Sequence, residues 1–307
     1  MHVSIGMPFC NSEKTLADAI RSVFAQHFED WELILVNDGS TDRSVEIAHS
    51  IRDPRVRVID DGVNRGLVPR LNQIVAMAHG DYMARMDDDD VMHPDRIVRQ
   101  IDHLASHPHV DVLGTAVYTI DLQSRVSGIR GMQKPEFNHE TFLARCGLTH
   151  PTVTGKTAWF RAHPYDERFV RAEDHELWCR TFPETHFDVL CEPLMFYREG
   201  RSRTIRKYLL SGRSDRQIYA AYGAPVVGWR VTLGLMAKSL MKDAAYCALW
   251  SCRREEIALA YSRGRLDPQE QRAAQNVLDT VRRMHLPGER VGLPQTSLDF
   301  VQQARSE

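Results

Sequence analysis

The sequence has few cysteines and no arrangement of them that indicates a disulfide framework. Its 307 residues include six cysteines, none of them in a C-x-x-C pair, and this favours a reducing, cytosolic setting. The first residues lack the basic segment and the long apolar core of a signal peptide. The most apolar long segment, residues 225–250, is interrupted by four charged residues and is too polar for a membrane span. We therefore expect a cytoplasmic protein.

The chain also lacks a strong charge of either sign. Its formal net charge is −2, so the overall balance gives no electrostatic reason to expect a nucleic-acid partner. With 43% hydrophobic and 26% charged residues, the composition excludes disordered and collagen-like classes. It is typical of one large globular domain with an appendage.

The first third of the sequence alternates strand-like and helix-like segments, which predicts an α/β fold with a mostly parallel twisted sheet flanked by helices. Asn11 and Ser12 are expected to cap the first helix. The predicted strands cover residues 3–7, 31–36, 56–59, 82–86 and 110–113, and the predicted helices in the same part of the chain cover residues 16–24, 45–48, 67–78 and 94–106. A further helix is predicted over residues 173–181.

Helix-forming residues dominate beyond about residue 200, so we expect a catalytic domain over residues 1–200 and a helical extension over 201–307. Asp267 followed by Pro268 marks a helix start. Trp229 to Trp250 predicts an amphipathic helix. That helix either packs against the catalytic domain or makes a peripheral contact with the inner face of a membrane.

Four consecutive aspartates, Asp87 to Asp90, follow the strand predicted at residues 82–86. Four carboxylates at the end of a buried strand repel one another and need a counter-charge. Alternate residues of an extended chain share a face, so Asp87 and Asp89 can point together and hold Mg²⁺ or Mn²⁺, which prefer oxygen ligands and also bind substrate phosphates. The alternative is a solvated acidic turn.

Eight motifs, in this order, resemble those of the family 2 glycosyltransferases, which are inverting, nucleotide-sugar-dependent enzymes with the GT-A fold. They cover roughly residues 1 to 200. The motifs are Pro8-Phe9-Cys10-Asn11, Val36-Asn37-Asp38-Gly39-Ser40-Thr41-Asp42, Asn64-Arg65-Gly66 with Arg70 and Asn72, Gly80-Asp81-Tyr82, Met86-Asp87-Asp88-Asp89-Asp90, Pro94-Asp95-Arg96, His150-Pro151-Thr152, and Ala172-Glu173-Asp174-His175-Glu176-Leu177-Trp178.

The resemblance implies a D-x-D motif at Asp87-Asp88-Asp89. In such a motif Asp89 holds the metal on the diphosphate, and Asp87 and Asp88 reach the ribose, the sugar or a metal-bound water. It also implies a metal or sugar contact for His150, whose alternative is an ordinary structural histidine.

For the nucleotide, the resemblance implies that Asp38 accepts a hydrogen bond from the base and that Arg65 or Arg70 contacts phosphate. The alternative for Asp38 is that it only forms a turn. The alternative for either arginine is that it is an ordinary solvated side chain. Members of the family usually carry an aromatic residue at the position of Cys10, where it can stack on the base. In this chain Phe9 could take that role. The alternative is that Phe9 and Cys10 only pack at the strand end.

For catalysis, the resemblance implies that Glu173 and Asp174 are the acidic pair, with Asp174 as the general base. Inversion by direct displacement requires a carboxylate that takes the proton of the acceptor hydroxyl. The alternative is that both residues only favour the first turn of a helix.

We therefore expect a metal-dependent inverting glycosyltransferase. By prevalence in the family, the donor is a UDP-sugar, the acceptor a saccharide or a lipid-linked saccharide, and the setting bacterial surface polysaccharide or lipopolysaccharide synthesis. Two alternatives stay open here: a haloacid-dehalogenase-like, Mg²⁺-dependent phosphatase, which the D-x-D-x-V pattern at residues 87–91 also fits, and a catalytically silent sugar-binding scaffold.

Overall fold

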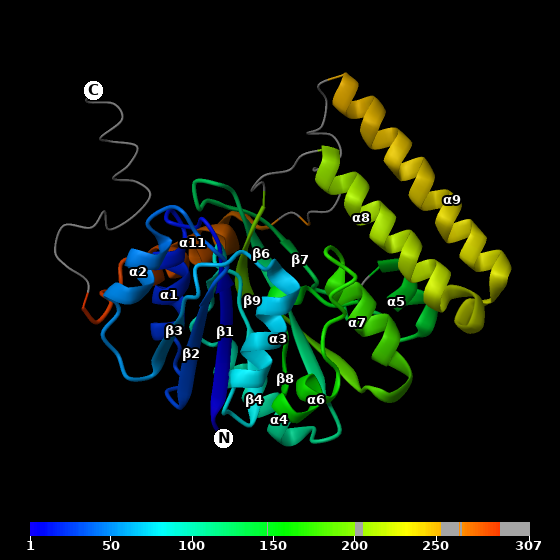
Figure 1. The fold of residues 1–307 in the computed structure, drawn as a ribbon. Coiled ribbons are helices and arrows are strands. Elements are labelled where there is room, and N and C mark those ends of the chain that lie inside the picture. The colour runs from blue at the N-terminus through cyan, green and yellow to red at the C-terminus, as the bar shows by residue number, and fades with distance from the viewer. Residues whose placement is uncertain (146, 200–204, 253–263, 265, 289–307) are drawn as a thin grey trace.

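The computed structural model describes residues 1–145, 147–199, 205–252, 264 and 266–288. Within these ranges, nine strands form one twisted sheet with helices on both of its faces (Figure 1). The strand order is β3-β2-β1-β4-β8-β6-β9-β5, and β7 pairs with β6.

The first half of the sheet is parallel and follows the chain closely. β2 and β4 flank β1, and β3 extends the sheet beyond β2. The strands are β1 (Val3–Phe9), β2 (Trp31–Asn37), β3 (Val56–Ile59) and β4 (Tyr82–Arg85), and the helices between them are α1 (Leu16–Phe24), α2 (Ser44–Ser50) and α3 (Leu67–Met77).

Side-chain alternation along β2 explains why helices cover both faces. Leu33 and Leu35 belong to the core cluster that includes α1, whereas Ile34 and Val36 belong to the cluster that includes α3. A parallel strand that is buried on both faces is expected to be apolar at every position. The sequence prediction of this α/β half is therefore confirmed.

The second half of the sheet is mixed. β8 lies antiparallel between β4 and β6, while β6 and β9 are parallel. Its elements are β5 (Val91–Met92), α4 (Arg96–Ser106), β6 (Val112–Ile120), β7 (Val126–Arg130), α5 (His139–Arg145), η1 (His150–Thr152), β8 (Thr154–Lys156), α6 (Thr157–Ala162), α7 (Glu173–Thr181), η2 (Phe182–Glu184) and β9 (Phe187–Arg198).

The described helices beyond residue 200 form two separate parts. α8 (Ile205–Ile218), the π-helix η3 (Tyr219–Gly223) and α9 (Ala224–Ser251) form a hairpin that projects to the upper right in Figure 1. α11 (Pro268–Arg282) instead lies against α1, where Arg282 Nε donates to Asp18 Oδ2 at 2.7 Å. The division at residue 200 stays a prediction, since α11 contacts the first domain directly.

Two helix starts show where local sequence reasoning succeeds and where it fails. Asp267 caps α11 as predicted, since its carboxylate accepts from the N–H groups of Gln269 and Glu270. The predicted cap of α1 is wrong: α1 begins at Leu16 without a side-chain cap, and Asn11 Oδ1 instead accepts from the Thr41 N–H at 2.8 Å.

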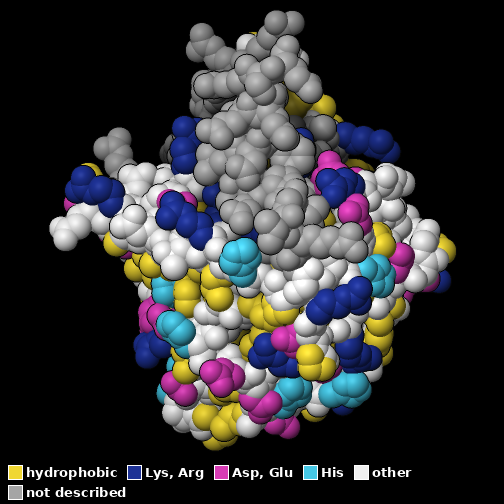
Figure 2. All heavy atoms as spheres, turned by 90° about the vertical axis from the view of Figure 1, so that its left-hand side faces the viewer, with side chains coloured by type: hydrophobic (Ala, Val, Ile, Leu, Met, Phe, Trp, Pro, Cys, Tyr) yellow, Lys and Arg dark blue, Asp and Glu magenta, His cyan; other side chains and the backbone are white. Residues whose placement is uncertain are grey.

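On the face in Figure 2, acidic, basic and histidine side chains are interspersed among apolar ones. As far as the described residues cover that face, no extended area carries a single sign of charge. None of the helices in the described ranges combines the length and the apolar character needed to cross a bilayer.

Candidate active site at the carboxyl ends of the strands

The four aspartates lie at the edge of the sheet where β1, β2 and β4 all end. β1 pairs in parallel with β4 through Gly6 and Arg85, and with β2 as far as Phe9 and Asn37. The Cys10 N–H, just past β1, donates to Asp88 Oδ2 at 3.1 Å. Asp88 therefore ties the end of β4 to the end of β1, at the edge where open α/β sheets bind ligands.

Three of these carboxylates converge. Asp87, Asp89 and Asp90 each offer an oxygen, and these oxygens lie within 4.8 Å of one another. Asp90 is buried: its Oδ1 accepts from the Arg198 N–H at 2.7 Å, and its Oδ2 has no hydrogen-bond partner in the described ranges. Burial, and then the charges of Asp89 and Asp87, raise the pKa of Asp90 well above its usual value.

An orphaned, buried carboxylate oxygen beside two further carboxylates fits a divalent cation, which would favour the ionised form of all three groups. The sequence prediction named Asp87 and Asp89 as metal ligands but omitted Asp90. The signal for Asp90 was present in the sequence, since it is the fourth of four consecutive aspartates.

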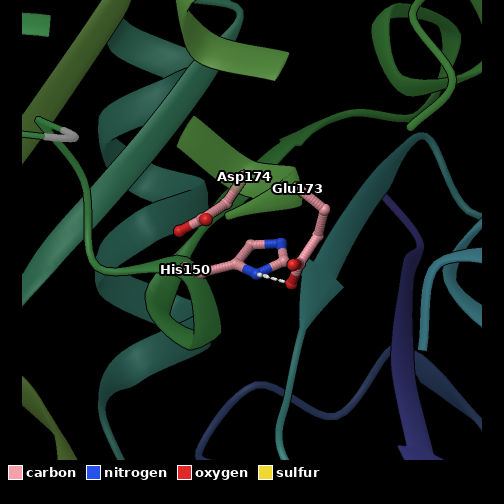
Figure 3. Close-up of side chains that lie close together, drawn as sticks. All are labelled: His150, Glu173 and Asp174. Carbon is pink, nitrogen blue, oxygen red and sulfur yellow. Dashed lines mark ion pairs between the residues drawn. The ribbon is translucent and has the colours of Figure 1, made fainter. Parts of the chain in front are cut away.

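A second cluster consists of His150, Glu173 and Asp174, whose ligand atoms also lie within 4.8 Å of one another (Figure 3). His150 comes from η1, and the two acids open α7. His150 Nδ1 lies 3.6 Å from Glu173 Oε1, and its Nε2 lies 2.9 Å from the Tyr165 hydroxyl. The structure thus groups His150 with the predicted catalytic pair and in a separate cluster from Asp87 and Asp89.

The two acids differ in exposure, and their neighbours set the protonation of this cluster. Glu173 is buried, whereas Asp174 is partly exposed. Burial, followed by the charge of Asp174, raises the pKa of Glu173 to about 7. Burial and the cation of Arg85 lower the pKa of His150 well below its usual value, so its imidazole is neutral at pH 7.

This shift predicts how stability depends on pH. Between about pH 4.5 and 7 the unfolded chain has lost the Glu173 proton while the folded protein retains it, so the free energy of unfolding falls as pH rises through this window. Glu173→Gln removes that loss. We expect the variant to be about 1–3 kcal/mol more stable than the parent at pH 8 and equally stable at pH 4.5.

Urea unfolding in EDTA at both pH values measures the difference. Glu184→Gln is the control, because the Glu184 side chain is largely exposed and no gain is expected there. Parent and Glu173→Gln curves with the same pH dependence would contradict the assigned protonation.

Arg85 lies between the two clusters and was missed by the sequence analysis. It is the last residue of β4 and is buried. Its Nη1 lies 2.5 Å from Asp87 Oδ1, and its Nε has no hydrogen-bond partner in the described part of the chain. Although burial opposes its charge, Asp87, Tyr165 and Glu173 raise its pKa above the usual arginine value. An arginine within an otherwise apolar strand was the available signal.

The predicted base-binding residue, Asp38, is held by the segment that leads into α3. Its Oδ1 accepts from the N–H groups of Arg65, at 2.7 Å, and Gly66, at 3.1 Å. Gly66 has a φ of 88°, which glycine adopts without the steric cost of a side chain. These contacts fix the Asp38 carboxylate at the end of β2.

The two predicted phosphate-binding arginines lie in different surroundings. Arg70 is fully buried, and its guanidinium contacts Asp38 (Nε to Oδ1, 3.2 Å) and Asp61 (Nη2 to Oδ1, 2.6 Å). Arg65 is about half exposed and pairs with Asp61 at 3.1 Å. In this arrangement Arg70 orients Asp38, while Arg65 is the arginine that solvent reaches.

The first motif divides between core and edge. Pro8 and Phe9 are buried, and Phe9 packs in the cluster around α1. Cys10 is half-buried at the strand end, where its Sγ lies 3.8 Å from Asn64 Nδ2. Cys10 is therefore more exposed than Phe9, and it lies beside Asn64, which donates to the Asp38 carbonyl.

Ala172, which precedes the catalytic pair, has a left-handed backbone (φ 57°, ψ 32°). This conformation is costly for a residue other than glycine and persists only where packing enforces it. Ala172 packs against the cluster that includes Phe169, Ile218 and Tyr219. The hairpin beyond residue 200 thus supports the start of α7.

The sequence model described as Glycosyl transferase family 2 matches residues 4–169. That range contains Asp38, the four aspartates and His150, and it ends before Glu173 and Asp174.

Two curated relatives have similar coverage. The putative glycosyltransferase EpsE of Bacillus subtilis is 34% identical over 190 residues, which are 59% of this chain and 67% of that protein. The putative colanic acid biosynthesis glycosyl transferase WcaA of Escherichia coli is 27% identical over 188 residues, 59% of this chain and 66% of that protein.

Solved structures support the fold. TarS of S. aureus, crystallised with UDP, aligns with a TM-score of 0.59 and 18% identity over 92% of this chain and 80% of that chain. The mannosyltransferase PcManGT of Pyrobaculum calidifontis, in complex with GDP-Man and Mn²⁺, aligns with a TM-score of 0.56 and 13% identity over 91% and 84%. At these identities the likeness shows the fold alone, and the predicted GT-A-like architecture with a helical carboxyl-terminal extension is confirmed.

Proposed function

The chain belongs to glycosyl transferase family 2, and we propose that this glycosyltransferase moves a sugar from a nucleotide diphosphate donor to an acceptor hydroxyl with inversion at the anomeric carbon. The observation that carries the proposal is the placement of Arg85. Its cation pairs with Asp87 of the first cluster and acts on Glu173 of the second. This placement supports the proposal that the donor-side acids and the predicted catalytic pair belong to one continuous site.

Asp87, Asp89 and Asp90 are the residues that would hold Mg²⁺ or Mn²⁺. A divalent cation there supplies a Lewis acid that neutralises the charge of the leaving diphosphate. The PcManGT structure contains Mn²⁺, and the orphaned Asp90 Oδ2 of this chain supports the same class of ligand. His150 was predicted as a further metal ligand. Because it lies beside Glu173, we assign it instead to the part of the site that would bind the acceptor.

Asp38 would accept a hydrogen bond from the nucleotide base, because an ionised carboxylate accepts strongly from an imide N–H. Arg70 and the Gly66 N–H hold that carboxylate in place. Arg65 is the exposed cation available to phosphate. We propose a UDP-sugar as donor, in line with the UDP complex of TarS.

Asp174 would act as the general base. It takes the proton of the acceptor hydroxyl while that oxygen bonds to the anomeric carbon and the bond from this carbon to the diphosphate oxygen breaks. Glu173, buried and with its pKa near 7, and the neutral His150 position the acceptor. Arg85 keeps a positive charge between the two sets of acids.

The biological setting follows the relatives. The E. coli relative is named for colanic acid biosynthesis, so we propose a role in bacterial surface polysaccharide or lipopolysaccharide synthesis with a saccharide or lipid-linked acceptor. Residues 1–200 form the proposed catalytic domain and residues 201–307 its extension. The proposed location is the cytoplasm, at the inner face of the membrane.

Of the two alternative functions, family membership removes the haloacid-dehalogenase-like phosphatase. In agreement, the D-x-D-x-V pattern of such enzymes ends the first strand of its domain, whereas here it follows β4. The silent scaffold differs from the enzyme in turnover, which an assay measures directly.

We expect one nucleotide sugar to raise the melting temperature only when Mn²⁺ or Mg²⁺ is also present. With that donor, Asp89→Ala should lower the rate of donor hydrolysis about 100-fold or more, since a catalytic metal contributes several kcal/mol. Asp102→Asn, an exposed change on α4, is the matched control. Equal background hydrolysis in parent and Asp89→Ala would favour the scaffold, and no metal-dependent response to any donor would overturn the proposed site.

A further inference from the structure

The α8–α9 hairpin is polar between its helices. Arg216 Nη1 of α8 donates to Ser239 Oγ at 2.9 Å and pairs with Asp243 Oδ2 at 2.7 Å, and both partners are on α9. Thr232 and Ser239 are the buried residues of α9. The polar side chains Ser239 and Asp243 of α9 therefore point toward α8 and help hold the two helices together.

One stripe on the exposed surface of α9 is apolar. The residue exposure is 63% at Trp229, 55% at Leu233 and 56% at Leu240. A helix at a water-facing surface normally places its apolar stripe inward, and contiguous exposed apolar side chains mark an interaction site. Of the two alternatives for the predicted amphipathic helix, packing against the catalytic domain does not hold for these three residues. The prediction is also wrong about the buried side of the helix, whose buried residues, Thr232 and Ser239, are polar.

The charges on α9 identify the partner. The helix carries three basic residues, Arg230, Lys238 and Lys242, all exposed, and its single acid, Asp243, turns inward to Arg216. By helical spacing, Arg230 borders the apolar stripe, and Lys238 and Lys242 lie on the opposite side of the helix. A helix with an apolar stripe and basic residues on the rest of its exposed surface matches an anionic lipid surface. In a symmetric contact between two copies the same face would meet itself, which would bring like charges together.

We propose that the α8–α9 hairpin is a peripheral docking surface for an anionic phospholipid bilayer. Trp229, Leu233 and Leu240 enter the interface between headgroups and acyl chains, Arg230 contacts lipid phosphates, and Lys238 and Lys242 add attraction to the negative surface potential. The hairpin lies in the plane of the surface and does not cross it.

The base of the hairpin connects this surface to the active site. Tyr222 Oη, in η3, donates to Glu176 Oε1 of α7 at 2.6 Å, and Ala172 packs on the same end of the hairpin. Glu173 and Asp174 directly follow Ala172. Docking would thus place the acceptor side of the site next to the bilayer, which suits a lipid-linked acceptor; this consequence rests on the proposed function.

Flotation of the full-length protein with vesicles tests the docking surface. We expect binding to phosphatidylcholine vesicles that contain phosphatidylglycerol, weaker binding at high salt, and little binding to phosphatidylcholine alone. Arg230→Gln/Lys238→Gln/Lys242→Gln should lower partitioning roughly 100-fold, at about tenfold or less per charge. Leu233→Glu/Leu240→Glu should lower it about tenfold or more.

Leu122→Glu is the matched control, because Leu122 is 53% exposed but lies in the turn between β6 and β7. It should bind vesicles like the parent. Absence of binding at low salt would overturn the proposal, as would equal binding by the Leu122 and Leu233/Leu240 variants. A concentration-dependent dimer that the Leu233/Leu240 change abolishes would assign the face to a second copy and would likewise overturn it.

Donor hydrolysis with Mn²⁺, measured without vesicles on the same samples, separates the two proposals. Hydrolysis without vesicle binding would overturn the proposed docking surface and leave the proposed function intact. Vesicle binding without hydrolysis would do the reverse.

Discussion

Asp174→Asn is expected to lower kcat by about 10²–10⁴-fold, because asparagine cannot take the proton of the acceptor hydroxyl. Donor affinity should change little, since Asp174 lies on the α7 side of the site and the nucleotide is assigned to Asp38 and the end of β2. Single-turnover transfer to an added acceptor, together with donor titration by calorimetry, measures both quantities.

Asp102→Asn and Glu173→Gln are the controls for this experiment. The first changes an exposed aspartate on α4 and should leave kcat unchanged. The second fixes the neutral form, which about half of the Glu173 side chains have at pH 7 because their pKa is about 7, and should cost less activity than Asp174→Asn. A kcat for Asp174→Asn within a few-fold of the parent would assign the base to another residue.

Arg70→Met is expected to destabilise the protein by about 3 kcal/mol or more, because removing one partner leaves the buried Asp38 carboxylate without its counter-charge. Asp38 should also lose its orientation, so the variant should bind the donor more weakly. Urea unfolding and donor titration measure the two effects.

Arg65→Met is a control provided by the chain itself. Arg65 and Arg70 both pair with Asp61, but Arg65 is about half exposed and an exposed ion pair contributes little to stability. We expect no measurable change in unfolding for Arg65→Met and, if Arg65 contacts phosphate, weaker donor binding alone. Equal destabilisation by both changes would show that the burial of Arg70 is not what makes it important.

Segments with a clear period were predicted well. The strand at Val56–Ile59 and the helix at Glu173–Thr181 have the predicted bounds, since alternation and helical spacing are local properties of the chain. The cap of α1 was not predicted correctly because Asn11 is held by Thr41, a residue on another loop.

The grouping of the acids illustrates the same limit. The sequence places His150 more than twenty residues before Glu173, and nothing local connects them. They meet because β8, which follows η1, inserts between β4 and β6. A charged residue in an apolar strand marks Arg85, but its link to Glu173 depends on α7, which lies far along the chain.

The sequence by itself determined the α/β class, the family and the positions of the acidic motifs, because each of these follows from local periodicity or from a short run of residues. Only the tertiary structure decided that the acids divide into two clusters around the buried cation of Arg85, and that the apolar stripe of α9 faces outward. Both depend on contacts between segments distant in the chain, and the inner face of α9 is occupied by the Arg216 and Asp243 pair.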